Sequence, residues 1–243
     1  LFEKSLSNNI NKKGNFLERL IFDEILSTFL INSKIRKTIK KFKKEKKIFD
    51  NDFSNSIQKK LNYELTNDQT NALNEINKDL KSEEKMFRLL QGDVGSGKTI
   101  VALISCLNVV NSGYQVAFMA PTEILAYQHY KLAQSLIKDK MKIGFLTSKT
   151  DYSERKKIIN DLETSKLNIL FGTHSVFQEK ISYKKLGLVV IDEQHKFGVK
   201  QRKKLSDKGG KNCDVLVMSA TPIPRTMIMT VFGDMDVTII KQK

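Results

Sequence analysis

The chain contains 243 residues, of which 40% are hydrophobic, and it carries a net charge of +15 at pH 7. This length predicts one large domain or one domain with an appendage, and the composition is sufficient for a sizeable core. The sequence argues against a membrane-spanning helix, which needs about 20 apolar residues, against a cleavable signal sequence, and against a structural zinc site, because its histidines and cysteines lack ligand spacing.

The excess of positive charge has two explanations. A polyanionic partner is one, because the neutralisation of phosphates dominates the affinity of proteins for nucleic acids. The other is that Lys is abundant throughout the chain and coats its surface. Both cysteines, Cys106 and Cys213, lie in apolar segments, which predicts free buried thiols in a cytoplasmic protein.

Residues 1–60 are predicted to form a helical segment that precedes the main domain. Apolar residues recur at helical spacing over 17–30, and a thinner apolar stripe continues through a basic run from Lys34 to Lys47. This run holds nine Lys or Arg residues and one acid, Glu45, so it is either a solvated helix face or a surface that contacts DNA. Residues 51–56, rich in Asn and Ser, are predicted to be a linker.

Residues 61–243 are predicted to form one α/β domain in which strands and helices alternate. Helices are expected at 99–110, 122–137 and 152–162. Near-continuous apolar strands separated by helices indicate a mainly parallel sheet flanked by helices, and such sheets bind ligands at the carboxyl ends of their strands. The expected strands are Phe87–Leu90, Gln115–Ala120, Lys142–Leu146, Asn168–Phe171, Leu186–Ile191, Asp214–Met218 and Val237–Ile240.

The stretch Gly92-Asp93-Val94-Gly95-Ser96-Gly97-Lys98-Thr99 fits the phosphate-binding pattern G-x-x-x-x-G-K-[ST] at every fixed position. Its glycines let the backbone wrap a polyphosphate, so that amide N–H groups at a helix N-terminus point at the anion. Lys98 would then contact the β- and γ-phosphates, and the Thr99 hydroxyl would bind Mg²⁺. Since a strand precedes the stretch and a helix follows it, we expect a site for ATP and Mg²⁺ rather than a simple glycine-rich turn.

Two carboxylates, Asp192 and Glu193, follow the expected strand Leu186–Ile191. Asp192 is suited to hold Mg²⁺ through a water molecule, and Glu193 is suited to orient and deprotonate the attacking water. Taken alone, a strand that ends in Asp-Glu is often only a capped loop. Following a phosphate-binding loop, the pair predicts a hydrolysis site.

Four segments together resemble the motifs of superfamily 2 helicases and translocases, and most closely those of the RecG family of bacterial ATP-dependent DNA helicases. They are Leu89–Thr99, Met119–Ala126 with Gln128-His129 after it, Ile191–Val199, which contains Asp192-Glu193-Gln194-His195, and Ser219–Thr226. The resemblance runs from about Phe16 to the C-terminus. It implies a RecA-like P-loop NTPase domain of a monomeric ATP hydrolase that acts on branched or double-stranded DNA in recombination and repair.

The resemblance also implies roles for individual residues. Gln69 would read the adenine edge, although a surface glutamine is the plainer interpretation. Two loops, Pro121-Thr122-Glu123 and Gly172-Thr173-His174, would hold the DNA backbone without reading its sequence, although Thr122 also fits a simple helix cap. Ser219-Ala220-Thr221 would couple hydrolysis to DNA movement, and His195 would form a hydrogen bond to it.

Motors of this superfamily hydrolyse ATP between two RecA-like domains, and this chain ends shortly after Thr221. The resemblance therefore predicts a fragment, namely a linker helix and the first motor domain, whose partners in the complete protein are a second RecA-like domain and a wedge domain. Two alternatives are a translocase similar to the transcription-repair coupling factor and a nucleotide-gated DNA-binding module without motor activity.

Overall fold

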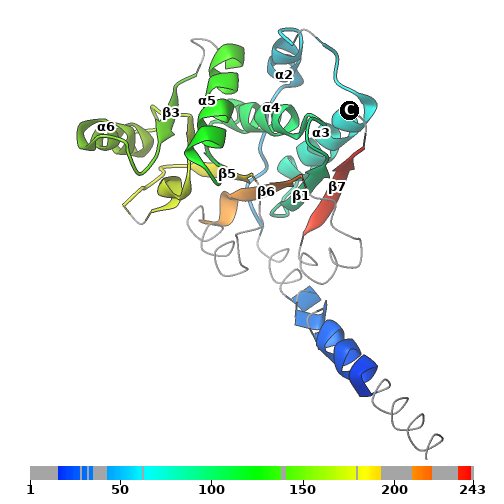
Figure 1. The fold of residues 1–243 in the computed structure, drawn as a ribbon. Helices are drawn as coiled ribbons and strands as arrows, with labels where there is room; N and C mark the ends of the chain where they lie inside the picture. The colour runs from blue at the N-terminus through cyan, green and yellow to red at the C-terminus, as the bar shows by residue number, and fades with distance from the viewer. Residues whose placement is uncertain are drawn as a thin grey trace, which may run out of the picture. The chain divides into compact units, whose positions relative to one another are not determined.

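The computed structural model describes residues 16–27, 29–31, 33–34, 43–61, 63–137, 141–178, 180–192, 210–220 and 235–241. The chain divides into two compact units. In the N-terminal unit, the described residues between 16 and 34 are helical, as their apolar spacing predicts, and their large apolar side chains are exposed (Figure 1). No helix in the described part of the chain is long and apolar enough to cross a membrane.

The second unit is built on a seven-stranded sheet in the order β3-β4-β2-β5-β6-β1-β7, in which every neighbouring pair is parallel. Side chains of β1, β2, β4, β5 and β6 are buried along their whole length, as expected of parallel strands covered on both faces. The strands are β1 Phe87–Gly92, β2 Gln115–Met119, β3 Ile143–Leu146, β4 Ile169–Gly172, β5 Leu186–Ile191, β6 Asp214–Ser219 and β7 Asp236–Ile240.

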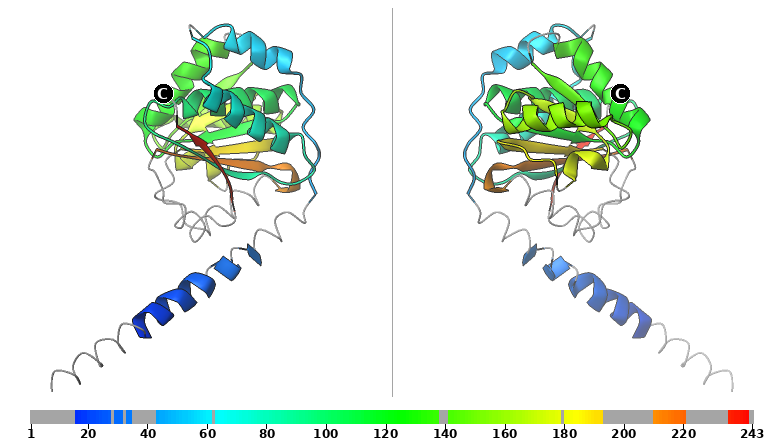
Figure 2. Two further views of the ribbon diagram at one scale, coloured as in Figure 1. Left: turned by 90° about the vertical axis from the view of Figure 1, so that its right-hand side faces the viewer. Right: turned by 90° about the vertical axis from the view of Figure 1, so that its left-hand side faces the viewer.

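Helices α3, α4 and α5 lie together on one face of this sheet (Figures 1 and 2). The central helix, α4, is buried over most of its surface, which explains why its sequence is apolar on all sides rather than amphipathic. The helices are α2 Asn51–Gln58, α3 Asn67–Leu80, α4 Lys98–Asn111, α5 Glu123–Ile137 and α6 Tyr152–Glu163, with short 3-10 helices η2 His174–Phe177 and η4 Gly210–Asn212.

All seven predicted strands are confirmed, and their bounds shift by two residues or fewer. The helices predicted over 99–110, 122–137 and 152–162 are confirmed as α4, α5 and α6. Helix α3 was not predicted, yet its start carries a capping box, in which the Thr66 side chain accepts from the Gln69 amide and the Gln69 side chain accepts from the Thr66 amide.

The linker predicted at residues 51–56 is wrong, because this segment belongs to helix α2. Asn, Asp and Ser have low helix propensity, so an isolated peptide of this composition would favour turns. Here, however, Phe49 and Ile57 flank the segment and enter the main hydrophobic core with residues of α4. Tertiary packing thus stabilises a helix that local propensity does not predict. The domain boundary after residue 60 stays a prediction.

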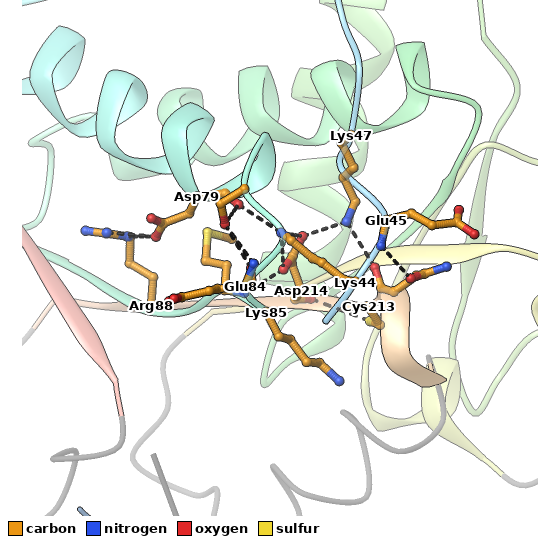
Figure 3. Close-up of polar contacts among 12 residues, drawn as sticks. Lys44, Glu45, Lys47, Asp79, Glu84, Lys85, Arg88, Cys213 and Asp214 are labelled. Carbon is orange, nitrogen blue, oxygen red and sulfur yellow. Dashed lines mark hydrogen bonds and ion pairs between the residues drawn. The ribbon is translucent and has the colours of Figure 1, made fainter. Parts of the chain in front are cut away.

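The basic run also differs from its prediction. Residues 35–42 of it, with the apolar stripe of Ile35, Ile39 and Phe42, lie outside the described part of the chain, so the stripe stays a prediction. The rest of the run, residues 43–47, is not helical. Lys43 and Lys46 are exposed, but Lys44 and Lys47 are buried at the amino edge of the sheet, where both bind Asp214 (Figure 3). A solvated face would leave this buried carboxylate without a counter-ion.

Candidate nucleotide site

The phosphate-binding loop connects the carboxyl end of β1 to the start of α4. Gly95 and Gly97 both have left-handed backbones, with φ of 83° and 80°, a conformation that favours glycine. A Cβ atom at Gly97 would also lie 2.3 Å from the Gln69 side chain. The loop therefore needs its glycines both for its turn and for the close approach of α3, and it presents the N-terminus of α4 at the carboxyl edge of the sheet.

Lys98, the first residue of α4, is buried, and its ammonium lies inside the loop. Its Nζ donates to the carbonyl oxygens of Gly92 and Asp93, each at 2.6 Å. These two carbonyls hold the Lys98 ammonium beside the N-terminus of α4. The ammonium and the helix N-terminus would both attract a phosphate. This arrangement agrees with the phosphate contact that the motif predicts for Lys98.

Asp192 follows β5 directly and lies at the same edge. Strand β6 alone separates β5 from β1, and because all three are parallel, their carboxyl ends open on one side. The Asp192 amide donates to the Met119 carbonyl at 2.8 Å, and its Oδ2 accepts from His129 Nε2 at 2.6 Å. Its side chain is 13% exposed. A partly exposed carboxylate and the Thr99 hydroxyl at one edge are hard oxygen ligands that fit Mg²⁺.

Gln69 contacts the phosphate loop directly. Its Nε2 donates to the Ser96 carbonyl at 3.0 Å, while its Oε1 accepts from the Thr66 amide at 3.0 Å. Both ends of the amide are thus engaged within the protein. The contact links α3 to the loop, and the reading of adenine by Gln69 stays a prediction.

The two loops predicted to hold DNA follow the adjacent strands β2 and β4. They are joined by a hydrogen bond from the Ala120 amide to the Gly172 carbonyl, at 3.0 Å. Thr122 Oγ1 accepts from the Leu125 amide at 3.2 Å, so its role as a helix cap is confirmed. Glu123 bonds to Lys149, and this hydrogen bond holds the pKa of Glu123 below its usual range.

Ser219, the last residue of β6, pairs with Gln91 of β1 and is buried, and the partly exposed Ala220 follows it. The structure therefore places the start of the predicted coupling segment between the strands that lead to the loop and to Asp192. Three predicted site residues, Glu193, His195 and Thr221, lie outside the described part of the chain.

The sequence profile of DEAD/DEAH box helicases matches residues 66–230, a range that contains both Lys98 and Asp192. The chain belongs to the DEAD/DEAH box helicase family. It is 46% identical over 240 residues to the ATP-dependent DNA helicase RecG of Aquifex aeolicus, covering 96% of this chain and 30% of that protein. For RecG of Thermotoga maritima the identity is 46% over 226 residues, covering 93% and 29%.

A solved structure agrees with this assignment to the helicase family. A structure of RecG bound to a three-way DNA junction superposes with a TM-score of 0.82 at 41% identity, covering 93% of this chain and 30% of that one. The UvsW helicase of bacteriophage T4 shares the fold alone, with a TM-score of 0.57 at 16% identity, covering 81% and 69%. The chain thus spans less than a third of the RecG relatives that it matches.

One residue of this helicase domain was missed from the sequence: His129, for which no site was expected. It comes from the middle of α5 and contacts the carboxylate predicted to hold the metal. A signal was present, because His129 shares the buried stripe of α5 with Ala126, Ala133 and Leu136, which predicts that the ring points toward the sheet. The stripe does not predict that His129 contacts Asp192, which lies 63 residues later in the sequence.

Proposed function

We propose that this chain is the ATP-binding motor domain of a RecG-type ATP-dependent DNA helicase, which remodels branched DNA in recombination and repair. The observation that carries the proposal is the position of Lys98 and Asp192 at one edge of a parallel sheet, in a chain 46% identical to RecG helicases. The free buried thiols, Cys106 and Cys213, support a cytoplasmic location.

The site residues divide the work of ATP hydrolysis. The loop amides and Lys98 bind and orient the phosphates, while Thr99 and Asp192 would hold Mg²⁺. Magnesium, when bound, neutralises charge on the phosphate oxygens. Glu193, the next residue after Asp192, accepts a proton from the attacking water and orients it, a contribution of about 10²–10⁴-fold. His195 would form a hydrogen bond to the segment that couples hydrolysis to movement.

DNA would be held by its phosphates. The loops Pro121-Thr122-Glu123 and Gly172-Thr173-His174 lie side by side, which supports contacts with one backbone and no reading of sequence. Ser219-Ala220-Thr221 would connect the ATP site to these loops. The charge of +15 supports a polyanionic partner.

Full activity would need a second RecA-like domain, which supplies an arginine that stabilises the transferring phosphate by about 10³–10⁵-fold. We expect the complete protein to work as a monomer with a wedge domain that engages the junction. The 243-residue chain alone should bind Mg-ATP weakly and hydrolyse it very slowly.

The decisive test is Glu193→Gln in the complete protein. We expect ATP binding to persist and DNA-stimulated hydrolysis to fall about 10³-fold, because glutamine cannot accept the proton. Phosphate release is measured with a three-way junction and with linear duplex. Glu163→Gln, the same change at an exposed position of α6, is the matched control and should behave as wild type.

The outcomes separate the assignments. Turnover that survives Glu193→Gln shows that Glu193 is not the base. Equal stimulation of wild type by junction and by linear duplex favours a translocase without specificity for branches. A wild-type protein that binds DNA but never hydrolyses ATP would contradict the motor proposal altogether.

A further inference from the structure

His129 and Asp192 form a partly buried contact, and the division of work proposed above gives His129 no role. The His129 side chain is 9% exposed, and its Nε2 lies 2.6 Å from Asp192 Oδ2. Because an ionised carboxylate only accepts hydrogen bonds, the geometry assigns the proton to Nε2. Within the described part of the chain, His129 is the side chain that hydrogen-bonds to the Asp192 carboxylate.

The imidazole of His129 also packs against an aromatic ring of the sheet. Its ring centroid lies 4.9 Å from that of Phe118 on β2, and Phe118 in turn lies 5.2 Å from Phe171 on β4. Small residues precede and follow it on the buried stripe of α5, Ala126 and Ala133, so the helix backbone lies close to the sheet. The direction of the Nε2–H bond is therefore fixed by packing before any ligand is present.

The backbone of Asp192 is fixed as well, because its amide donates to the Met119 carbonyl at the end of β2. With the main chain anchored there, the remaining freedom of Asp192 is rotation of its carboxylate. A hydrogen bond from His129 to Oδ2 removes that rotation. Partners of this kind orient the carboxylates that bind metals, and their loss commonly weakens metal affinity by about 10–100-fold.

We propose that His129 is a positioning residue that orients the Asp192 carboxylate for the magnesium ion of the ATP site. The inference rests on the proposed function and deepens it, since it assigns a role to α5 in the metal site. A histidine that only fills space beside Phe118 is the competing explanation. The two differ in what the Nε2–H group contributes, and substitutions can separate ring volume from hydrogen bonding.

Two substitutions in the complete protein make that separation. His129→Phe keeps an aromatic ring against Phe118 but has no donor. His129→Gln loses the ring but carries an amide N–H at a similar distance from the backbone as Nε2. Binding of a fluorescent, non-hydrolysable ATP analogue is followed while Mg²⁺ is titrated, and again in EDTA. The readout is the Mg²⁺ concentration that gives half of the magnesium-dependent gain in affinity.

We expect His129→Phe to raise this Mg²⁺ concentration about 10-fold. We expect His129→Gln to restore it close to the wild-type value, and binding in EDTA to be the same in all three proteins. An unchanged Mg²⁺ requirement in His129→Phe overturns the inference. So does an equal rise in both variants, since the donor would then not be the group that matters.

Thermal unfolding shows whether the variants are folded. If Phe is not accommodated at this position, His129→Met is the second variant without a donor, and the same rise is expected. Wild type separates the two levels of inference. Magnesium-dependent binding in wild type that is unaltered in His129→Phe removes only the role of His129, whereas no magnesium-dependent binding in wild type removes the proposed ATP site and the role of His129 with it.

Discussion

Asp214 begins strand β6 and Asp192 follows the neighbouring strand β5, so the two residues lie at opposite edges of the sheet. Asp214 begins β6 at the amino edge, and its side chain is fully buried. It accepts hydrogen bonds from Lys44 at 2.7 and 2.8 Å, from Lys47 at 2.6 Å and from the Met86 amide at 2.7 Å (Figure 3). Asp192 follows β5 at the carboxyl edge, is partly exposed, and has a hydrogen bond from His129.

The two carboxylates differ in their remaining capacity to bind a ligand. Both oxygens of Asp214 are occupied by donors of the protein itself, as a buried charge requires, so this group stabilises the fold and has no capacity for a ligand. Asp192 accepts a hydrogen bond from the His129 ring and faces solvent in part, which leaves it able to meet a cation. The Asp214 carboxylate is thus paired within the chain, whereas the Asp192 carboxylate is the one that we propose to hold a cation.

The largest expected effect follows from removing the charge of Asp214. Asp214→Asn leaves the shape intact but buries two ammonium groups, Lys44 and Lys47, without a counter-ion. We expect the free energy of unfolding to fall by about 3–5 kcal/mol. Urea unfolding of the chain, followed by circular dichroism, measures it.

Asp192→Asn is the matched control, because it makes the same change on the neighbouring strand. It should cost about 1 kcal/mol or less, since one hydrogen bond to a partly exposed group is altered. Equal losses in the two variants would break the comparison, because they would show that both edges are built for stability.

A smaller effect is expected from Lys44→Met. Burial lowers the pKa of the Lys44 ammonium, the nearby Lys47 lowers it further, and Asp214 opposes both. The cost of burying this ammonium therefore offsets part of its attraction to Asp214, and its loss leaves Asp214 paired with Lys47. We expect a cost of about 1–3 kcal/mol, below that of Asp214→Asn. Lys46→Met, at an exposed neighbour, should change the urea midpoint little; a larger loss for Lys44→Met than for Asp214→Asn would contradict this order.

The sequence predicts the sheet well, because buried parallel strands are apolar over their whole length and need no information from distant residues. Prediction from the sequence fails where contacts between distant residues determine the local structure. Helix α2 is stabilised by Ile57 in the core, and Lys44 and Lys47 are buried because Asp214, about 170 residues later, needs counter-ions. Helix α3 is a different case, because Thr66 and Gln69 form a capping-box pattern that local sequence alone can predict.

The same division applies to the site. The phosphate loop is local, so its pattern alone predicts the strand, the turn and the helix that position Lys98, and Asp192 follows from its place after a strand. The contact of Lys98 with phosphates stays a prediction. The hydrogen bond between His129 and Asp192 depends on strand order, which brings α5 from the end of β2 beside the end of β5. Glu193 stays a prediction, resting on its position next to Asp192.

The smallest expected effect comes from the hydrogen bond between Tyr114 and Glu45 at the amino edge, and it is measured at alkaline pH. The Tyr114 hydroxyl donates to Glu45 at 2.6 Å, and burial together with this bond raises the pKa of Tyr114 to about 12. The unfolded chain loses the same proton near pH 10, at the ordinary value of tyrosine. Between about pH 10 and 12 the unfolded state therefore binds fewer protons, and stability must fall as the pH rises.

Tyr114→Phe removes this contribution to the alkaline decline. The urea midpoint of the variant should fall less steeply than that of wild type above pH 10, while the difference between them stays constant between about pH 6 and 9, where neither Tyr114 nor Glu45 titrates. Tyr152→Phe, at an exposed residue that begins α6, should leave the slope unchanged. If Tyr114→Phe declines as steeply as wild type, the proton of Tyr114 is not linked to folding. The amino edge would then be held by Asp214 and its lysines without the part of the cluster formed by Tyr114 and Glu45.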